Sequence, residues 1–420
     1  MVNVMLVLAG AVFGSMLLFL MIVLSVFIAA TLKKEKKYGT YTPNVSIIIP
    51  AYNEAAAIRE CLDSVLRLDY PKHKTEIIVV DDGSEDRTAD IARAYGKHGV
   101  KLIRTRHEGK PAALNAGIKK AKYNILFTVD SDTVLDRKCL AEIVKPLADR
   151  TIAATTANCR VKNKSSLLGM FQNIEYHYNN LISNSFSKAF NQGSWFFGAI
   201  ACYRKDALQR IGLFKQGALA EDMQAALEIA KSGYKAMNIK SAIGYTHVPE
   251  SIKELYRQRY RWSIGGMQAV MKNRKAFSRK TSPSTYFLGF TQFWGPVYSL
   301  LCLPIIAYLV AYWLPYNSSS FMSLFLYLFR WFSITGIFYV IYKISAWGIA
   351  YYTLFGILSG ILSTAMILAS LNMYKDRSLK NLAPIFFYFP YTILLNSIII
   401  ISVIRSLTAE NSLLRLSRHE

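Results

Sequence analysis

Two carboxylates stand one residue apart after an apolar run. Asp130 and Asp132 come directly after residues 125 to 129, which have the composition of a buried strand. Carboxylate oxygens are the hard ligands that Mg²⁺ and Mn²⁺ prefer, and such an ion can bridge the oxygens of a diphosphate. A D-x-D triplet alone is common by chance. Its position at a strand end is what predicts a divalent-metal site.

Two other strand ends carry groups suited to a nucleotide. Pro50 and Tyr52 to Glu54 follow one β-branched run, and Asp81 to Ser84 follow the next. Tyr52 could stack on a base, and a carboxylate could accept hydrogen bonds from base N–H groups and ribose hydroxyls. Each turn alone is equally well explained as an acidic turn closing a strand. Together, in this order, the two turns favour nucleotide binding. Lys110 is a candidate diphosphate contact or a solvated lysine.

Two later motifs could serve the acceptor side of a transfer reaction. A carboxylate of the Glu221-Asp222 pair could act as a general base. The alternative is an acidic helix N-terminus, which the helix dipole favours. In the Gln258 to Trp262 segment, Trp262 offers a flat face to a sugar ring and Arg261 offers a bidentate donor to phosphate. A basic membrane-surface helix explains the same segment, and both interpretations are compatible.

The elements that must position these residues alternate between strand and helix. Short apolar runs bounded by turns predict strands, and polar-apolar stretches between them predict helices. This alternation implies parallel βαβ units, a doubly wound sheet and ligand binding at the carboxyl ends of its strands. We expect strands at residues 45–49, 76–80, 100–104 and 125–129, and helices near 54–67, 86–97 and 111–121.

Composition predicts a membrane protein with one large domain outside the bilayer. Of the 420 residues, 52% are hydrophobic, and they collect before about residue 31 and after about residue 284. Residues 4–30 carry no charge and are long enough to cross the hydrocarbon core. Four lysines follow between residues 33 and 37. They predict that the end of this segment is cytoplasmic and that the N-terminus lies outside. A cleaved signal peptide is the rival interpretation, but the run is long and its basic flank is on the wrong side.

The C-terminal part predicts three or four further membrane helices. Residues 251–275 mix apolar and basic side chains, which is typical of an amphipathic helix on the inner membrane surface. The basic loop at Lys375, Arg377 and Lys380 should be cytoplasmic, whereas four full spans after the globular domain would place it outside. One segment is therefore expected to be re-entrant or interfacial. The apolar segments lie near 285–314, 321–345, 347–371 and 384–404.

Charge and cysteine usage restrict the partners. The net charge of +23 fits a positive-inside bias and attraction to anionic lipid headgroups. Nucleic-acid binding is disfavoured because no nucleic-acid motif accompanies the charge. The five cysteines form no CxxC pair, which fits free thiols in a reducing compartment.

Taken in order, these motifs resemble the signature of processive family-2 glycosyltransferases, the group of cellulose, chitin, hyaluronan and poly-N-acetylglucosamine synthases. The resemblance covers roughly residues 40 to 275, and the QxxRW element is its most specific part. A single N-terminal span and the Val248-Pro249-Glu250 run look most like bacterial poly-β-1,6-N-acetylglucosamine synthases. The chain departs from the group at two places. Ala220 stands where Thr is common, and the Ala-Ile-Ala-Cys that follows Gly198 lacks the hydroxyl residue often found in that loop.

The resemblance implies a role for each motif. Asp82 would bind uracil with Tyr52 stacked on it, and Asp130 would contact the nucleotide. Asp132 would hold the metal, and Asp222 would be the catalytic base. The remaining candidates are Pro50, Glu54 and Lys110 for the nucleotide, Glu221 beside the base, and Gln258, Arg261, Trp262, Phe197 and Gly198 for the acceptor and diphosphate.

The sequence thus predicts an α/β GT-A domain combined with transmembrane helices in the plasma membrane. We expect an anchor at 1–37, the GT-A domain at 40–250, the interface helix at 251–283, membrane helices at 284–406 and a tail at 407–420. The domain would be cytoplasmic and would use a UDP-sugar with Mg²⁺ or Mn²⁺, inverting the anomeric carbon. The product would be a β-linked polysaccharide that is exported through the helices. An accessory membrane subunit is a candidate partner. The alternatives are single addition to a lipid or glycolipid, and a transporter or scaffold with an inactive domain.

Overall fold

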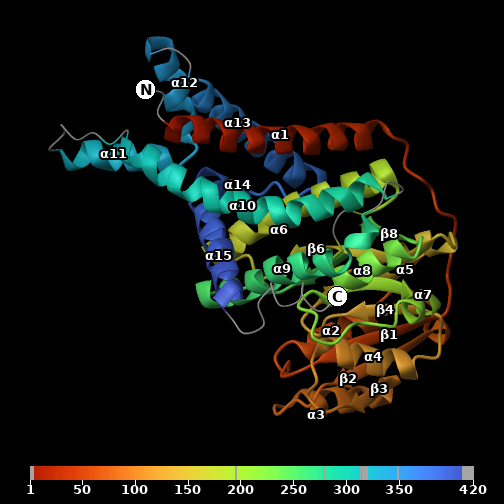
Figure 1. Ribbon diagram of the computed structural model, residues 1–420. Helices are drawn as coiled ribbons and strands as arrows, with labels where there is room; N and C mark the ends of the chain where they lie inside the picture. The colour runs from red at the N-terminus through yellow and green to blue at the C-terminus, as the bar shows by residue number, and fades with distance from the viewer. Residues whose placement is uncertain are drawn as a thin grey trace.

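The globular part of the computed structural model is built on one eight-stranded sheet (Figure 1). The structure describes residues 4–193, 196–277, 281–312, 314, 320–347 and 350–408. The strands are β1 (Val45–Ala51), β2 (Thr75–Asp81), β3 (Val100–Arg104), β4 (Ile125–Val129), β5 (Val134–Leu135), β6 (Ile152–Val161), β7 (Ile200–Arg204) and β8 (Lys235–Thr246). Their order across the sheet is β3-β2-β1-β4-β7-β6-β8-β5.

The predicted parallel half of the sheet is confirmed, and the other half is mixed. Strands β1 to β4 pair in parallel, with Ala51 opposite Asp81 at the carboxyl ends of β1 and β2. Strand β7 runs antiparallel to both β4 and β6, and β5 runs antiparallel to β8. Because β7 is reversed, the loop before it meets the end of β4, where the Asp130 N–H donates to the Ala199 carbonyl at 3.0 Å.

Helices cover both faces of this sheet, which explains why its strands are apolar on both sides. Successive residues of a strand face opposite ways, so Ile47 and Ile49 enter one core and Ile48 enters the other. The helices around the sheet are α2 (Ile58–Leu66), α3 (Thr88–Ala94), α4 (Lys110–Lys120), α5 (Cys139–Val144), α7 (Lys205–Arg210) and α8 (Glu221–Lys231). Short 3-10 turns span Lys72–Lys74, Tyr95–His98, Lys145–Ala148 and Arg274–Ala276.

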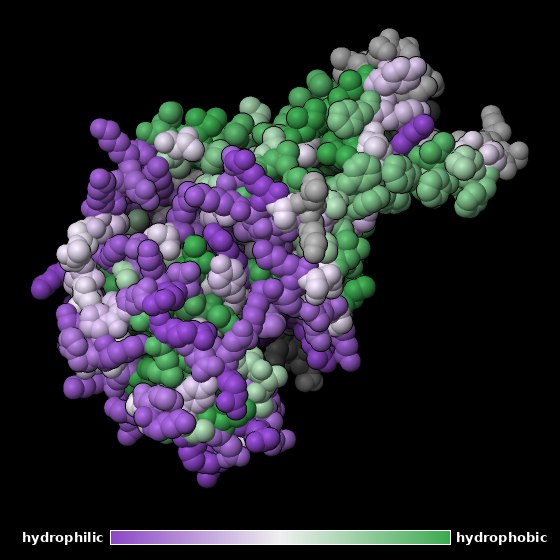
Figure 2. All heavy atoms as spheres, turned by 180° about the vertical axis from the view of Figure 1, so that it is seen from behind, coloured by the Kyte–Doolittle hydropathy of each residue, from purple (hydrophilic) through white to green (hydrophobic). Residues whose placement is uncertain are grey.

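A second, apolar region is made of long helices. In the described part of the chain, four are long and apolar enough to cross a membrane: α1 (Val4–Leu32), α10 (Pro283–Tyr312), α13 (Tyr351–Met373) and α15 (Tyr388–Thr408). Between them lie α11 (Phe321–Phe332), α12 (Thr335–Trp347) and α14 (Leu379–Phe386). Figure 2 shows hydrophobic side chains gathered on these helices and hydrophilic ones on the sheet domain.

Two packing clusters fix the relative directions of α1, α10 and α13. Leu20 and Val23, from the second half of α1, pack with Phe287 at the start of α10 and with Tyr374 just beyond α13. Ala9, from the first half of α1, packs with Ile305 near the end of α10, and Tyr352 at the start of α13 lies against the same cluster. Helix α1 therefore runs antiparallel to α10 and parallel to α13. The end of α1, the start of α10 and the end of α13 lie on one side.

The directions of these helices explain why the basic loop after α13 lies on the same side as the end of α1. Helices α11 and α12 meet at a bend of 106°, so they form either a broken span or a re-entrant loop. Since α10 ends and α13 begins on the same side, the bent pair departs from that side and returns to it. One predicted segment is thus bent, and the loop holding Lys375 and Arg377 stays beside the sheet domain.

Two further helices join the sheet domain to the apolar region. The amphipathic helix expected at 251–275 is α9 (Ile252–Lys272), and its buried face includes Leu255, Ile264 and Met267. Helix α6 (Leu167–Phe190), which sequence reasoning did not predict, contributes Leu181 and Ile182 to the cluster with α1 and α13. Of the tail expected at 407–420, residues 409–420 lie outside the described residues.

Candidate active site

The D-x-D carboxylates, of which Asp132 is expected to hold a metal, stand near Glu54 at the carboxyl edge of the sheet. Burial and the neighbouring charges of Asp132 and Asp130 raise the pKa of Glu54 to about 7. Burial, followed by the charge of Asp130, raises the pKa of Asp132 above its usual value. This concentration of negative charge on oxygen ligands fits a divalent cation. No set of three or more His, Cys, Asp or Glu side chains in the described residues forms a complete metal site, so phosphate oxygens would have to complete the coordination.

Lys110 links the nucleotide side of the site to the candidate base. It is the first residue of α4, and its Nζ lies 2.7 Å from Asp130 Oδ1 and 3.3 Å from Glu221 Oε1. The charges of these carboxylates outweigh burial and raise the pKa of Lys110, so the ammonium stays charged. A fixed positive charge between the two motifs suits a diphosphate leaving group.

Asp222 lies in the first turn of α8, and backbone N–H groups hold its carboxylate. Oδ2 accepts from Gly198 N–H at 2.7 Å, and Oδ1 accepts from Met223 N–H at 2.7 Å. Burial and the charge of Glu221 raise its pKa to about 6, against the opposing effect of Lys110 and the two N–H groups. A carboxylate with that pKa is ionised near neutral pH and is still basic enough to take a proton.

The loop before β7 requires glycine beside this carboxylate. A Cβ at Gly198 would lie 2.5 Å from Asp222 Oδ2 and 2.6 Å from Asp222 Cβ. The preceding residue is held as well, because the Thr156 hydroxyl donates to the Phe197 carbonyl at 2.6 Å. The structure therefore places the Phe197–Gly198 loop beside the candidate base, and the acceptor role expected of this loop stays a prediction.

The residues expected to bind the base are already engaged with the protein. Asp82 is buried, and its carboxylate accepts from Gly109 N–H at 2.8 Å and from the Thr105 hydroxyl at 3.0 Å. The Tyr52 ring stacks on His107 with ring centroids 3.9 Å apart. Pro50 lies within β1, paired with Val80. The uracil-binding roles of Asp82 and Tyr52 stay predictions, and His107 is a neighbour that the sequence did not single out.

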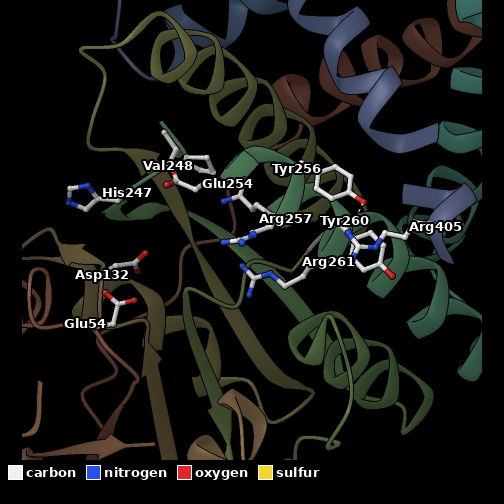
Figure 3. Close-up of a pocket in the computed structure, with 12 residues that line it drawn as sticks. Glu54, Asp132, His247, Val248, Glu254, Tyr256, Arg257, Tyr260, Arg261 and Arg405 are labelled. Atoms are coloured by element: carbon white, nitrogen blue, oxygen red, sulfur yellow. Dashed lines mark hydrogen bonds between the residues drawn. The ribbon is translucent and has the colours of Figure 1, made fainter. Parts of the chain in front are cut away.

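A cavity of about 810 Å³ opens from the acidic strand ends toward α9 (Figure 3). Glu54 and Asp132 line one end, and Gln258 and Arg261 of the QxxRW element line the α9 side. Trp262 is not part of this lining; it is 39% exposed, and the Arg259 guanidinium lies 4.2 Å from its ring centroid. Two of the three QxxRW side chains thus line the same cavity as Glu54 and Asp132.

Comparison with known proteins agrees with this geometry. Residues 46–212 match the model of glycosyl transferase family 2. The poly-β-1,6-N-acetyl-D-glucosamine synthase of Staphylococcus epidermidis is 33% identical over 294 residues, which cover 66% of this chain and 69% of that protein. The Staphylococcus aureus enzyme of the same name is 30% identical over 256 residues, 59% of this chain and 60% of that one.

The chain belongs to glycosyl transferase family 2. A mannosyltransferase from Pyrobaculum calidifontis, solved in complex with GDP-Man and Mn²⁺, has a similar structure, with a TM-score of 0.61 and 25% identity. The similarity covers 89% of this chain and 99% of the mannosyltransferase, so it includes the membrane-type helices as well as the sheet domain. The predicted GT-A fold is thereby confirmed, and the chain is a glycosyltransferase.

The glycosyltransferase cavity also contains residues that sequence reasoning missed. His247 follows β8, and Tyr256, Arg257 and Tyr260 share the helix of the QxxRW element. Helical spacing could have suggested these α9 residues, since positions three and four apart lie on one face. Arg405 comes from α15, far away in the sequence, and no local pattern connects it to this site.

A buried ion pair fixes α9 against α6 and α15. Arg259 Nη2 donates to Glu175 Oε2 at 2.9 Å, and the Tyr391 hydroxyl donates to the same oxygen at 2.6 Å. Arg259 is only 6% exposed. Because unpaired buried charges are costly, this contact among three helices holds α9, with the QxxRW element, in one position.

Proposed function

We propose that this glycosyltransferase transfers N-acetylglucosamine from UDP-N-acetylglucosamine to a growing β-1,6-linked polysaccharide, inverting the anomeric carbon. One observation carries the proposal: Lys110 bridges Asp130 and Glu221, so the metal-site carboxylates and the candidate base Asp222 belong to one charged site. The donor and linkage follow from the names of the staphylococcal relatives.

The side chains of this site divide the reaction between them. The acceptor hydroxyl attacks the anomeric carbon and gives its proton to the Asp222 carboxylate, while the bond to UDP breaks. Gly198 and Met223 N–H groups orient that carboxylate. Lys110 and Arg261 would stabilise charge on the departing diphosphate, because preorganised cations stabilise charge that develops in the transition state. Trp262 is proposed as an acceptor platform next to the cavity.

Asp132, with Glu54 beside it, is the proposed holder of a Mg²⁺ or Mn²⁺ ion. The bound ion would neutralise charge on the diphosphate as a Lewis acid. The raised pKa values of Glu54 and Asp132, caused by burial and mutual repulsion, support this assignment because a cation would relieve both effects. The Mn²⁺ in the similar mannosyltransferase supports it as well.

The donor can be tested directly. Purified protein in detergent is supplied with Mn²⁺ and a panel of sugar nucleotides that includes UDP-N-acetylglucosamine and GDP-mannose, and nucleotide release is measured. We expect release of UDP from UDP-N-acetylglucosamine alone, and a product ladder on mass spectrometry. Release from GDP-mannose alone would refute the proposed donor, and a product one sugar long would refute polymer synthesis.

Metal removal should abolish activity reversibly. EDTA treatment is expected to stop UDP release, and Mn²⁺ titration should restore it. In Asp132→Asn the Mn²⁺ concentration for half-maximal activity should rise by about tenfold, because one charged oxygen ligand is lost. Asp136→Asn, at an exposed position a few residues along the chain, is the matched control and should titrate like wild type. Equal titration curves for all three proteins would contradict the role of Asp132.

We further propose that the sheet domain is cytoplasmic in a multi-pass plasma-membrane protein. The lysines that follow α1 support this orientation. The start of α10 and the end of α13 lie on the same side as the end of α1. Ser320, just before α11, would then face outside.

Cysteine labelling tests this orientation, since the five native cysteines are buried and free. Ser320→Cys and Ser378→Cys place thiols at exposed positions before α11 and after α13. A membrane-impermeant maleimide should label the first variant in intact cells, and the second only after permeabilisation. The reverse pattern would overturn the orientation, and labelling of both in intact cells would mean that α13 does not cross.

A further inference from the structure

The cavity beside the catalytic edge has two oppositely charged ends. Glu54 and Asp132 line one end. Arg257 and Arg405 also line the cavity, as do Arg261, which is proposed above for the donor diphosphate, and Glu254. None of the three arginines forms an ion pair with an acidic side chain within the described residues. Figure 3 shows Arg257 and Arg261 extending from α9, with Arg405 beside Tyr260. These arginines are exposed to solvent, and their positive charge on the wall of a cavity of about 810 Å³ suits an anionic ligand.

Two tyrosines hold Arg405 at the wall of the cavity. Its Nη1 donates to the Tyr256 hydroxyl at 3.4 Å, and its guanidinium lies 5.8 Å from the centroid of the Tyr260 ring. Both contacts leave most of the guanidinium donors free. Guanidinium groups bind phosphate oxygens bidentately, and tyrosine hydroxyls can add further hydrogen bonds. The chemistry of this end therefore suits a phosphate group.

The position of Arg405 indicates where that phosphate comes from. Arg405 lies in the last turn of α15, a helix apolar enough to cross a membrane. Ile401, Ile404 and Leu407 around it are 49–56% exposed, which fits a surface covered by lipid. A basic residue at the end of such a helix lies at the depth of lipid headgroups. Of the two cations proposed for the donor diphosphate, Lys110 does not line this cavity and Arg261 does, so the lipid site rests on Arg257 and Arg405.

We propose that the Arg257–Arg405 end of the cavity binds the phosphate group of a membrane lipid. The proposal rests on the proposed function only in assigning the acidic end to the sugar donor. A lipid held there has its phosphate in the cavity and its chains along α15, so its headgroup lies in the same cavity as the metal-site carboxylates. This end of the cavity is completed only when α15 packs on α9.

Binding of a soluble phospholipid tests the proposal. Full-length protein in a maltoside detergent, which carries no phosphate, is titrated with dioctanoyl phosphatidic acid by calorimetry. Arg405→Gln and Arg257→Gln should each weaken its binding by about tenfold, because one charge-assisted contact is lost. The matched control is Arg377→Gln, an exposed arginine in the loop after α13 that does not line the cavity, and it should bind as wild type. UDP affinity in Mn²⁺ should change by less than twofold in Arg405→Gln.

Three results would overturn the proposal. The first is unchanged lipid binding in both cavity variants. The second is loss of UDP binding in Arg405→Gln with lipid binding intact, which would assign this end to the donor diphosphate. The third is inorganic phosphate binding as tightly as the lipid, which would mean a site for free phosphate. Arg405→Lys, which keeps the charge, should bind the lipid more tightly than Arg405→Gln. This recovery would show that the weaker binding of Arg405→Gln is not caused by misfolding. Failure of the wild type to release UDP bears on the donor proposal alone.

Discussion

Replacing Asp222 by Asn is expected to lower kcat for UDP release by about 10²- to 10⁴-fold, the usual contribution of a general base. The carboxamide keeps an oxygen for one of the N–H groups of Gly198 and Met223, but it cannot take up the acceptor proton. Since acceptor and donor contacts stay in place, KM should change little. Steady-state UDP release at saturating donor measures both constants.

Asp206→Asn is a matched control for this variant. Asp206 also lies in the first turn of a helix, α7, but it is exposed and does not line the cavity. Its kcat should equal that of wild type. If Asp222→Asn retained more than a tenth of wild-type kcat, Asp222 would not be the base.

The same carboxylate predicts the acid limb of the pH profile. Burial and Glu221 raise the pKa of Asp222 to about 6, and the base works only when ionised. Activity should therefore be nearly level above pH 7 and fall about tenfold for each pH unit below 6. For stability the sign is opposite: a raised carboxyl pKa means that folding favours the protonated form, so stability falls as pH rises from about 4 to 6. Asp222→Asn should unfold at or above the wild-type Tm at pH 7.5, which separates lost catalysis from lost folding.

Gly198→Ala is expected to lower kcat by about 100-fold, although it adds only one methyl group. The new Cβ would lie 2.5 Å from Asp222 Oδ2, so the carboxylate or the loop before β7 must move. Displacing a reacting group by about 1 Å costs this much in rate. The measurement is the same assay, with Tm recorded in parallel.

The control for this substitution is Gly96→Ala, where an added Cβ meets nothing within 4 Å. It should leave kcat unchanged. Full activity in Gly198→Ala would show that the loop moves freely, and the N–H contact of Gly198 would then not define the position of the base.

Some of this architecture follows from local sequence. The β-branched runs before Pro50, Asp81 and Asp130 predicted β1, β2 and β4, because strands covered on both faces must be apolar on both sides. Parallel pairing then placed the turns after these strands at one edge, where Glu54, Asp82 and Asp132 are found. The mixed composition of residues 251–275 predicted α9 for a similarly local reason, since a helix with one buried face repeats every 3.6 residues.

The antiparallel direction of strand β7 could not be predicted from local sequence. Its direction is set by packing between β4 and β6, and it decides that Gly198 meets Asp222. The bend between α11 and α12 could not be predicted either, because both helices are apolar and hydropathy carries no information about the direction of a helix. Trp262 was expected in the acceptor site, yet the buried Arg259 beside it determines how its ring lies.

The sequence by itself determined the family, the acidic carboxyl edge of the sheet and the long apolar helices of this protein, because motif spacing, strand ends and apolar length are local properties of the chain. Only the tertiary structure decided that Lys110 bridges Asp130 and Glu221, that Glu175 and Tyr391 hold Arg259, and that Arg405 lines the cavity. Each of these contacts joins residues far apart in sequence. Their partners are set by how α4, α8, α9 and α15 pack, and packing depends on the shape of the whole fold.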